Sequence, residues 1–185
     1  MTALLIIDIQ NDYFEDGAMP LVGALDASKN AKIVLEKFRI HNLPVIHIQH
    51  IALKPNATFF LPNSNGVNIH NSVYPLPTEK VIVKHFPNSF IETELLEYLK
   101  TSKISDLTIC GMMTHMCIDA TTRAAKDFGF NCTLIGDACA TKSLEIDGQT
   151  INAASVHYSF LAALNYHYSS VKSTKQILSE FPIQS

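Results

Sequence analysis

Cys117 is the first residue of this chain whose type and position point to chemistry. It ends the segment GMMTHMC (111–117), which lies between an apolar, strand-like run at 107–110 and a helix-like run that reaches Phe128. The first turn of a helix leaves backbone N–H groups unpaired and carries the positive end of the helix dipole, and both stabilise a thiolate. The position therefore predicts that Cys117 is a nucleophile at neutral pH.

Two charged residues stand at similar places after other strand-like runs. Asp8 closes the apolar run 3–8, and Lys84 follows the run 81–83. In an open parallel sheet the carboxyl ends of the strands meet at one rim, where ligands bind. We therefore expect Asp8, Lys84 and Cys117 to share a site, with Asp8 as the acid–base group and Lys84 as an electrostatic partner.

Short strand-like runs alternate with amphipathic helical segments along the chain. The expected strands are 3–8, 45–49, 81–83, 107–110, 132–135 and 168–171. The expected helices are 27–38, 95–99, the segment after Cys117, 151–164, and a short last helix with a capping-box pair, Ser173 and Gln176. Residues 51–79 contain four prolines and no sustained period, which indicates a surface loop. The pattern predicts one α/β domain, 1–185, with a three-layer α-β-α Rossmann-like fold and a central, mainly parallel six-stranded sheet.

The composition argues against several classes of function. With 47% apolar residues, a net charge of −3 and no cluster of basic residues, the chain does not resemble a nucleic-acid-binding protein. No apolar run approaches the length of a membrane span, which is about 18 residues. The apolar start of the chain is too short for a signal peptide. We therefore expect a cytoplasmic protein. Neither GxGxxG nor a P-loop occurs, so no cofactor is predicted. The four cysteines are expected to be free thiols.

Four segments of the chain together resemble the isochorismatase-like cysteine hydrolase superfamily, which includes nicotinamidases and N-carbamoyl amidohydrolases. They are LLIIDIQNDYF (4–14), VIVKHFPNSF (81–90), ICGMMTHMCIDATTRAA (109–125) and IGDACAT (135–141). The resemblance implies that Asp8, Lys84 and Cys117 form a catalytic triad. It also implies a non-proline cis peptide between Met112 and Met113, with the N–H groups of Met113 and Cys117 as an oxyanion hole.

The reaction implied by this resemblance is hydrolysis of an amide or ureide C–N bond of a small molecule through a Cys117 thioester. Two alternatives stay open. One is the vinyl ether hydrolysis of the true isochorismatases, against which the presence of Cys117 argues. The other is a catalytically inactive homologue that only binds a small molecule.

The metal ligands of nicotinamidases are not reproduced after the second expected strand, where this chain reads His47-Ile48-Gln49-His50. His47 and His50 are three residues apart on a strand, so they point to opposite faces and cannot chelate one ion. The segment FFLPNSNGVNIH (59–70) resembles a metal-free subgroup of these hydrolases. We therefore expect no metal, and whether His50 or His70 contributes to the pocket stays open.

Aromatic and apolar residues near the predicted rim are candidates for the wall of a substrate pocket: Phe14, Phe59, Phe60, Leu61, Phe86 and Phe90. His115 lies two residues before the nucleophile and could line the pocket, tune Cys117 or face a neighbouring subunit. Asp12, Asp119 and Asp137 are interpreted as capping residues. By resemblance we expect a homodimer or homotetramer, with helix 151–164 a candidate for the interface.

Overall fold

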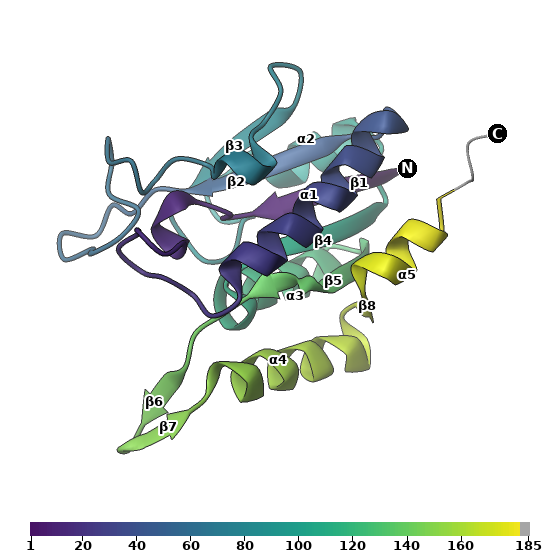
Figure 1. Cartoon of the computed structure of the whole chain (residues 1–185). Coiled ribbons are helices and arrows are strands. Elements are labelled where there is room, and N and C mark those ends of the chain that lie inside the picture. The colour runs from purple at the N-terminus through teal and green to yellow at the C-terminus, as the bar shows by residue number, and fades with distance from the viewer. Residues whose placement is uncertain (182–185) are drawn as a thin grey trace.

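The computed structural model describes residues 1–181 and contains a central sheet of six strands, every pair of which is parallel. The strands are β1 (Thr2–Ile7), β2 (Val45–His50), β3 (Lys80–Lys84), β4 (Asp106–Met112), β5 (Asn131–Ala140) and β8 (Ser170–Lys172). Their order in the sheet is β3-β2-β1-β4-β5-β8 (Figure 1). The predicted α/β class and six-stranded parallel sheet are therefore confirmed.

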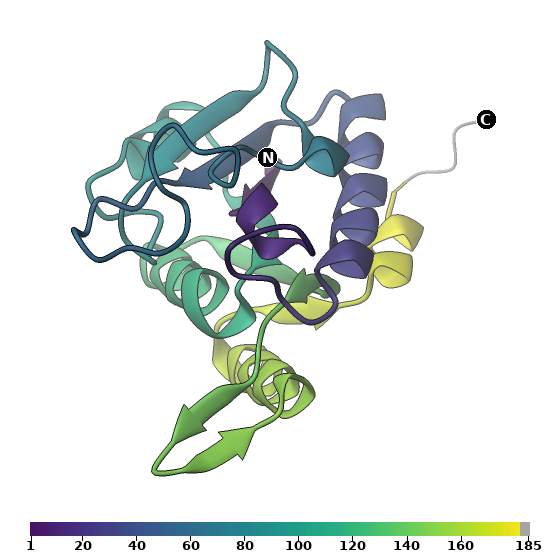
Figure 2. The same cartoon turned by 60° about the vertical axis from the view of Figure 1, so that its left-hand side comes forward.

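Helices cover both faces of the sheet, as the alternation predicts (Figures 1 and 2). One face packs against α1 (Ala24–Ile40) and α5 (Thr174–Ser179). The other packs against α2 (Leu95–Thr101), α3 (Asp119–Asp127) and α4 (Ala153–His167). Along β1, Leu4 and Ile6 enter the first core while Leu5 and Ile7 enter the second, because successive side chains of a strand point to opposite faces. The near-continuous apolar run of β1 is thus explained by burial on both sides.

Three short helical turns lie in the connections: η1 (Asn11–Tyr13), η2 (Asn71–Val73) and the π-helical turn η3 (Thr114–Ile118). The segment 51–79 contains only η2, which confirms the predicted irregular loop. The capping box of Ser173 and Gln176 at the start of α5 is also confirmed. Within residues 1–181 no helix is both long and apolar enough to cross a membrane.

Two features in the C-terminal half of the chain differ from the prediction. Strand β5 continues to Ala140, past a register shift opposite β4, so Asp137 lies inside the strand and not after it. Its carboxylate accepts hydrogen bonds from the Thr174 N–H and hydroxyl, so Asp137 holds the start of α5, as the capping interpretation expects. Between β5 and α4 an antiparallel hairpin, β6 (Leu144–Ile146) and β7 (Gln149–Ile151), extends away from the body (Figure 1).

Candidate active site

Asp8 directly follows β1, where the backbone bends into the left-handed region with a φ of 52°. The neighbouring strand β4 passes very close to this point, because a Cβ on Gly111 would lie 1.9 Å from the Ile7 carbonyl oxygen. Gly111 itself has a φ of 133°, which side chains rarely tolerate. Glycine at position 111 thus lets β4 approach β1, and the two strands end side by side.

Lys84 is the last residue of β3, the edge strand, and its long side chain is fully buried. The Nζ atom lies 2.7 Å from Asp8 Oδ2 and 3.2 Å from Cys117 Sγ. The structure therefore brings together the three residues that the sequence singled out. Burial alone would lower the pKa of Lys84, but the charges of Asp8 and Cys117 outweigh it and raise that pKa, so Lys84 carries its proton.

Cys117 lies in the π-helical turn η3, one element before α3, and is buried. Burial, followed by the negative charge of Asp8, raises the pKa of the Cys117 thiol, and Lys84 only partly opposes this. The sequence argument from the helix N-terminus considers the turn that favours a thiolate, but not this burial, which opposes it. Desolvation penalises the charged form more than the turn and the lysine favour it, so the free thiol is neutral.

The Asp8 carboxylate is buried beside this neutral thiol. Oδ2 is close to the Lys84 ammonium, yet within the described residues 1–181 neither oxygen makes a hydrogen bond with favourable angles. A buried carboxylate normally uses its lone pairs, because an unpaired acceptor loses its solvation without compensation. Asp8 therefore has free acceptor capacity at the place where Cys117 must lose a proton.

The peptide bond between Met112 and Met113 is cis, which confirms that prediction. The Met113 carbonyl accepts the N–H groups of Met116 and Ile118 and so anchors the turn that carries Cys117. No hydrogen bond from the Met113 N–H occurs within residues 1–181. This N–H, close in sequence to the nucleophile, is available to a ligand.

Four aromatic rings form a wall next to the triad. Tyr13 and Phe60 are 4.6 Å apart between ring centroids, Phe59 lies 4.9 Å from Phe60, and His50 lies 5.9 Å from Phe60. Burial and then the charges of Cys117 and Asp8 raise the pKa of Tyr13, so its hydroxyl belongs to the same electrostatic environment. The predicted pocket set includes Phe59 and Phe60 but misses Tyr13, although it lies in the QNDYF part of the first motif.

The other pocket candidates have different surroundings. Phe14 stacks on His70 with ring centroids 3.7 Å apart, the side chain of Leu61 is exposed, and that of Phe86 is partly exposed. Phe90 packs against Phe128 and Phe130 in the core cluster that also contains Cys117, so its place in the pocket wall stays a prediction.

His115 is held by residues outside the triad. Its Nδ1 lies 2.6 Å from the Thr141 hydroxyl oxygen, and its ring meets Phe160 of α4 edge to face at 6.0 Å. Burial and the charge of Lys142 lower the pKa of His115. These contacts tie η3 to α4, which is a structural role that the sequence analysis did not consider.

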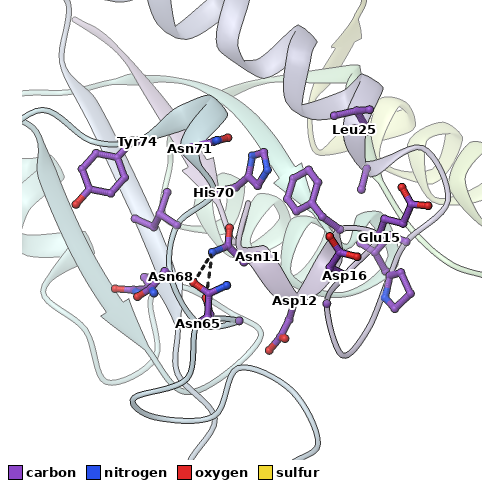
Figure 3. A pocket seen from close by; sticks show the side chains of 18 of the residues that line it. Asn11, Asp12, Glu15, Asp16, Leu25, Asn65, Asn68, His70, Asn71 and Tyr74 are labelled. Carbon is purple, nitrogen blue, oxygen red and sulfur yellow. Dashed lines mark hydrogen bonds between the residues drawn. The ribbon is translucent and has the colours of Figure 1, made fainter.

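A surface cavity of about 1340 Å³ is lined by residues other than Asp8, Lys84 and Cys117. It is lined by segments of 11–26 and 65–75, with the Phe14–His70 stack in its wall (Figure 3). The Asn11 side chain, which lines this cavity, donates to Asn65 (Figure 3). The candidate active site is therefore defined by the contacts among Asp8, Lys84 and Cys117, and not by this cavity.

The model of the isochorismatase domain matches residues 2–162. The chain belongs to the isochorismatase family. It is 51% identical over 177 residues to the uncharacterized isochorismatase family protein YddQ of Bacillus subtilis, covering 96% of this chain and 98% of that protein. It is 32% identical over 139 residues to a streptothricin hydrolase of Streptomyces noursei, covering 75% and 49%.

The crystal structure of an isochorismatase hydrolase homologue from Oleispira antarctica superposes with a TM-score of 0.93 at 46% identity, over 96% of each chain. Together with the hydrolases among the relatives, these similarities make the chain an isochorismatase-family hydrolase. The resemblance stated from the motifs is thereby confirmed.

Asp8, His50 and Cys117 offer one ligand atom each within 4.8 Å of one another, which is a geometry that could hold a metal ion. The Lys84 ammonium, however, contacts all three groups, and its charge opposes a second cation there. His47 points away from this group and bonds Glu79, as the opposite-face prediction requires. These residues therefore do not fit the nicotinamidase type of metal site.

Asp12 is structural, as predicted. Its carboxylate accepts from the N–H groups of Ala18 and Phe60, and a Cβ on Gly66 would collide with it at 1.9 Å. Asp12 thus holds Phe60 in the aromatic wall. Asp119 pairs with Arg123 on α3 and takes no part in the triad contacts.

Proposed function

We propose that this family member hydrolyses an amide or ureide C–N bond of a small molecule through a thioester on Cys117. One observation carries the proposal: a neutral buried thiol, a carboxylate with free acceptor capacity and a charged ammonium group lie in mutual contact. A thiol of raised pKa needs a base at the moment of attack, and Asp8 is the base within reach.

In the first half-reaction Asp8 takes the Cys117 proton, and Lys84 stabilises the thiolate. The sulfur attacks the substrate carbonyl carbon, and the N–H groups of Met113 and Cys117 receive the developing oxyanion. The C–N bond then breaks, and the departing ammonia or amine takes the proton from Asp8. In the second half-reaction Asp8 activates a water molecule, the C–S bond breaks, and the acid product leaves with Cys117 protonated again.

The pocket supports a small, partly apolar acyl group, because Tyr13, Phe59 and Phe60 form the wall beside the triad. This chemistry needs no cofactor. The reaction is a hydrolysis, as is the reaction that the name of the related streptothricin hydrolase describes. The vinyl ether reaction differs in one testable respect. There Asp8 alone would protonate the substrate, and the thiol would be dispensable.

The test is a pair of variants with a matched control. Cys117→Ala should remain folded and lose turnover of a panel of aliphatic, aromatic and charged amides, while Cys132→Ala, at another buried thiol, should keep it. Mass spectrometry of the wild type after brief exposure to the panel should detect an acyl group on Cys117. Undiminished turnover by Cys117→Ala would contradict the thioester and favour the vinyl ether type of reaction.

We also propose that a second copy of this chain packs on α4, giving a homodimer or homotetramer. The 15 residues of α4 include no Asp, Glu, Lys or Arg, and Tyr158 and Tyr166 are 69% and 93% exposed on its outer side. The adjacent hairpin β6–β7 extends from the body, and an isolated two-stranded hairpin is marginally stable. Tyr158→Glu with Tyr166→Glu should reduce the mass measured by light scattering.

The cytoplasmic location stays a prediction.

A further inference from the structure

His50 stands beside Lys84 at the ends of two neighbouring strands, because it is the last residue of β2 and is paired with Lys84 in the register of the sheet. Its Nδ1 atom lies 2.9 Å from Lys84 Nζ. Its ring also faces Phe60 in the aromatic wall. The family triad has no role for this residue, although it touches the ammonium directly.

The ammonium group of Lys84 has three hydrogens and makes three hydrogen bonds of good geometry. The acceptors are His50 Nδ1, the Phe86 carbonyl oxygen at 3.1 Å and Cys117 Sγ. Asp8 Oδ2 lies at 2.7 Å from the same Nζ, and this ion pair does not have hydrogen-bond angles within residues 1–181. Since the three N–H bonds of an ammonium are tetrahedral, fixing two of them on His50 and Phe86 aims the third at the sulfur.

His50 can accept this hydrogen bond only as a neutral ring with its proton on Nε2. Burial, followed by the charge of Lys84, lowers the pKa of His50 to about 4, and His85 acts in the same direction while Asp8 opposes it. The ring is therefore neutral near pH 7. A protonated ring would instead present an N–H to the ammonium and repel it.

The backbone of His50 is also held. Gln10 is fully buried and bonds both sides of this residue, donating from Nε2 to the His50 carbonyl at 2.9 Å and accepting the His50 N–H on Oε1 at 2.7 Å. The same Nε2 donates to the Val67 carbonyl at 2.7 Å. Because Gln10 lies two residues after Asp8, it ties the end of β2 to the segment that carries the base.

We propose that His50 is a positioning residue, whose neutral Nδ1 holds one Lys84 hydrogen so that another points at the Cys117 sulfur. The inference rests on the proposed cysteine hydrolase function. Without this acceptor the ammonium is free to rotate about its Cε–Nζ bond, and the thiolate formed during attack loses its hydrogen bond.

Three variants of His50 test whether its Nδ1 atom positions the Lys84 ammonium. His50→Asn keeps an acceptor oxygen near the place of Nδ1, His50→Gln places its amide near the position of Nε2, and His50→Leu removes both. A hydrogen bond to a charged group is worth roughly 1.5–3 kcal/mol, so kcat should fall about 10- to 100-fold in the Gln and Leu variants. In the Asn variant it should fall no more than about threefold by the same reasoning, and KM should hardly change in any of them.

A second measurement needs no substrate. The rate of Cys117 alkylation by iodoacetamide, measured by mass spectrometry across pH with Cys132 as internal reference, should fall at neutral pH in the Gln and Leu variants but not in Asn. If the amide panel is not turned over at all, the proposed function fails while this comparison still tests His50. Equal alkylation in the three variants, or rescue by Gln and not by Asn, overturns the proposal. So does a loss in all three that follows a lower melting temperature.

Discussion

Replacing Lys84 by methionine should destabilise the fold strongly, because the ammonium compensates a buried carboxylate. Both side chains are fully buried, and Asp8 has no hydrogen bond of good geometry to fall back on. Methionine has a similar length and keeps most of the packing, so the change isolates the charge. Removing one partner of a buried ion pair typically costs roughly 3–5 kcal/mol.

This cost is a large share of the about 5–15 kcal/mol that stabilises a typical domain. Urea unfolding followed by circular dichroism measures it, and with a slope of about 2 kcal/mol per molar urea the midpoint should fall by roughly 1.5–2.5 M. Lys32→Met is the matched control, because Lys32 forms an exposed and loose ion pair with Glu36, 3.9 Å apart. Its midpoint should hardly move.

The decisive comparison adds Asp8→Asn to Lys84→Met. If Asp8 is the uncompensated charge, neutralising it should restore most of the lost stability. Both variants should remain inactive, because the cation is absent from both and the base is absent from the double variant. An unchanged midpoint for Lys84→Met would refute the reasoning. A double variant that is even less stable than Lys84→Met would also refute it. Additive losses of unfolding free energy would mean that the two residues are not coupled.

Two further predictions concern stability. Gly111→Ala should lower the melting temperature far more than Gly129→Ala, since both have positive φ but only a Cβ at 111 meets backbone, at 1.9 Å. Burial raises the pKa of Glu79, but hydrogen bonds led by that from Arg39 outweigh it and lower the pKa to about 2. The ionised Glu79 therefore stabilises the fold above its unfolded pKa of about 4.3, and this is lost as pH falls toward 2. Thermal unfolding should show that Glu79→Gln is less stable than the wild type at pH 7, with the difference shrinking between pH 4.5 and 2.

Much of the architecture follows from local patterns. Apolar runs of five to six residues can only be buried on both faces, and their alternation with amphipathic segments leaves a parallel sheet as the simple solution. The hairpin 144–151 escaped prediction because its strands are three residues each and mostly exposed, so no apolar period marks them. The length of β5 depends on a register shift against β4, which is a contact between distant segments.

The sequence by itself determined the family, the order of the strands along the chain and the three residues that meet at the rim, because residue types at strand ends are a local signal. Only the tertiary structure decided the raised pKa of Cys117, the wall built by Tyr13 and Phe60, and the hydrogen bond that Lys84 donates to His50. The reason is that a pKa depends on desolvation and on charges brought from other strands. Both arise only when β1, β2, β3 and the turn after β4 come together.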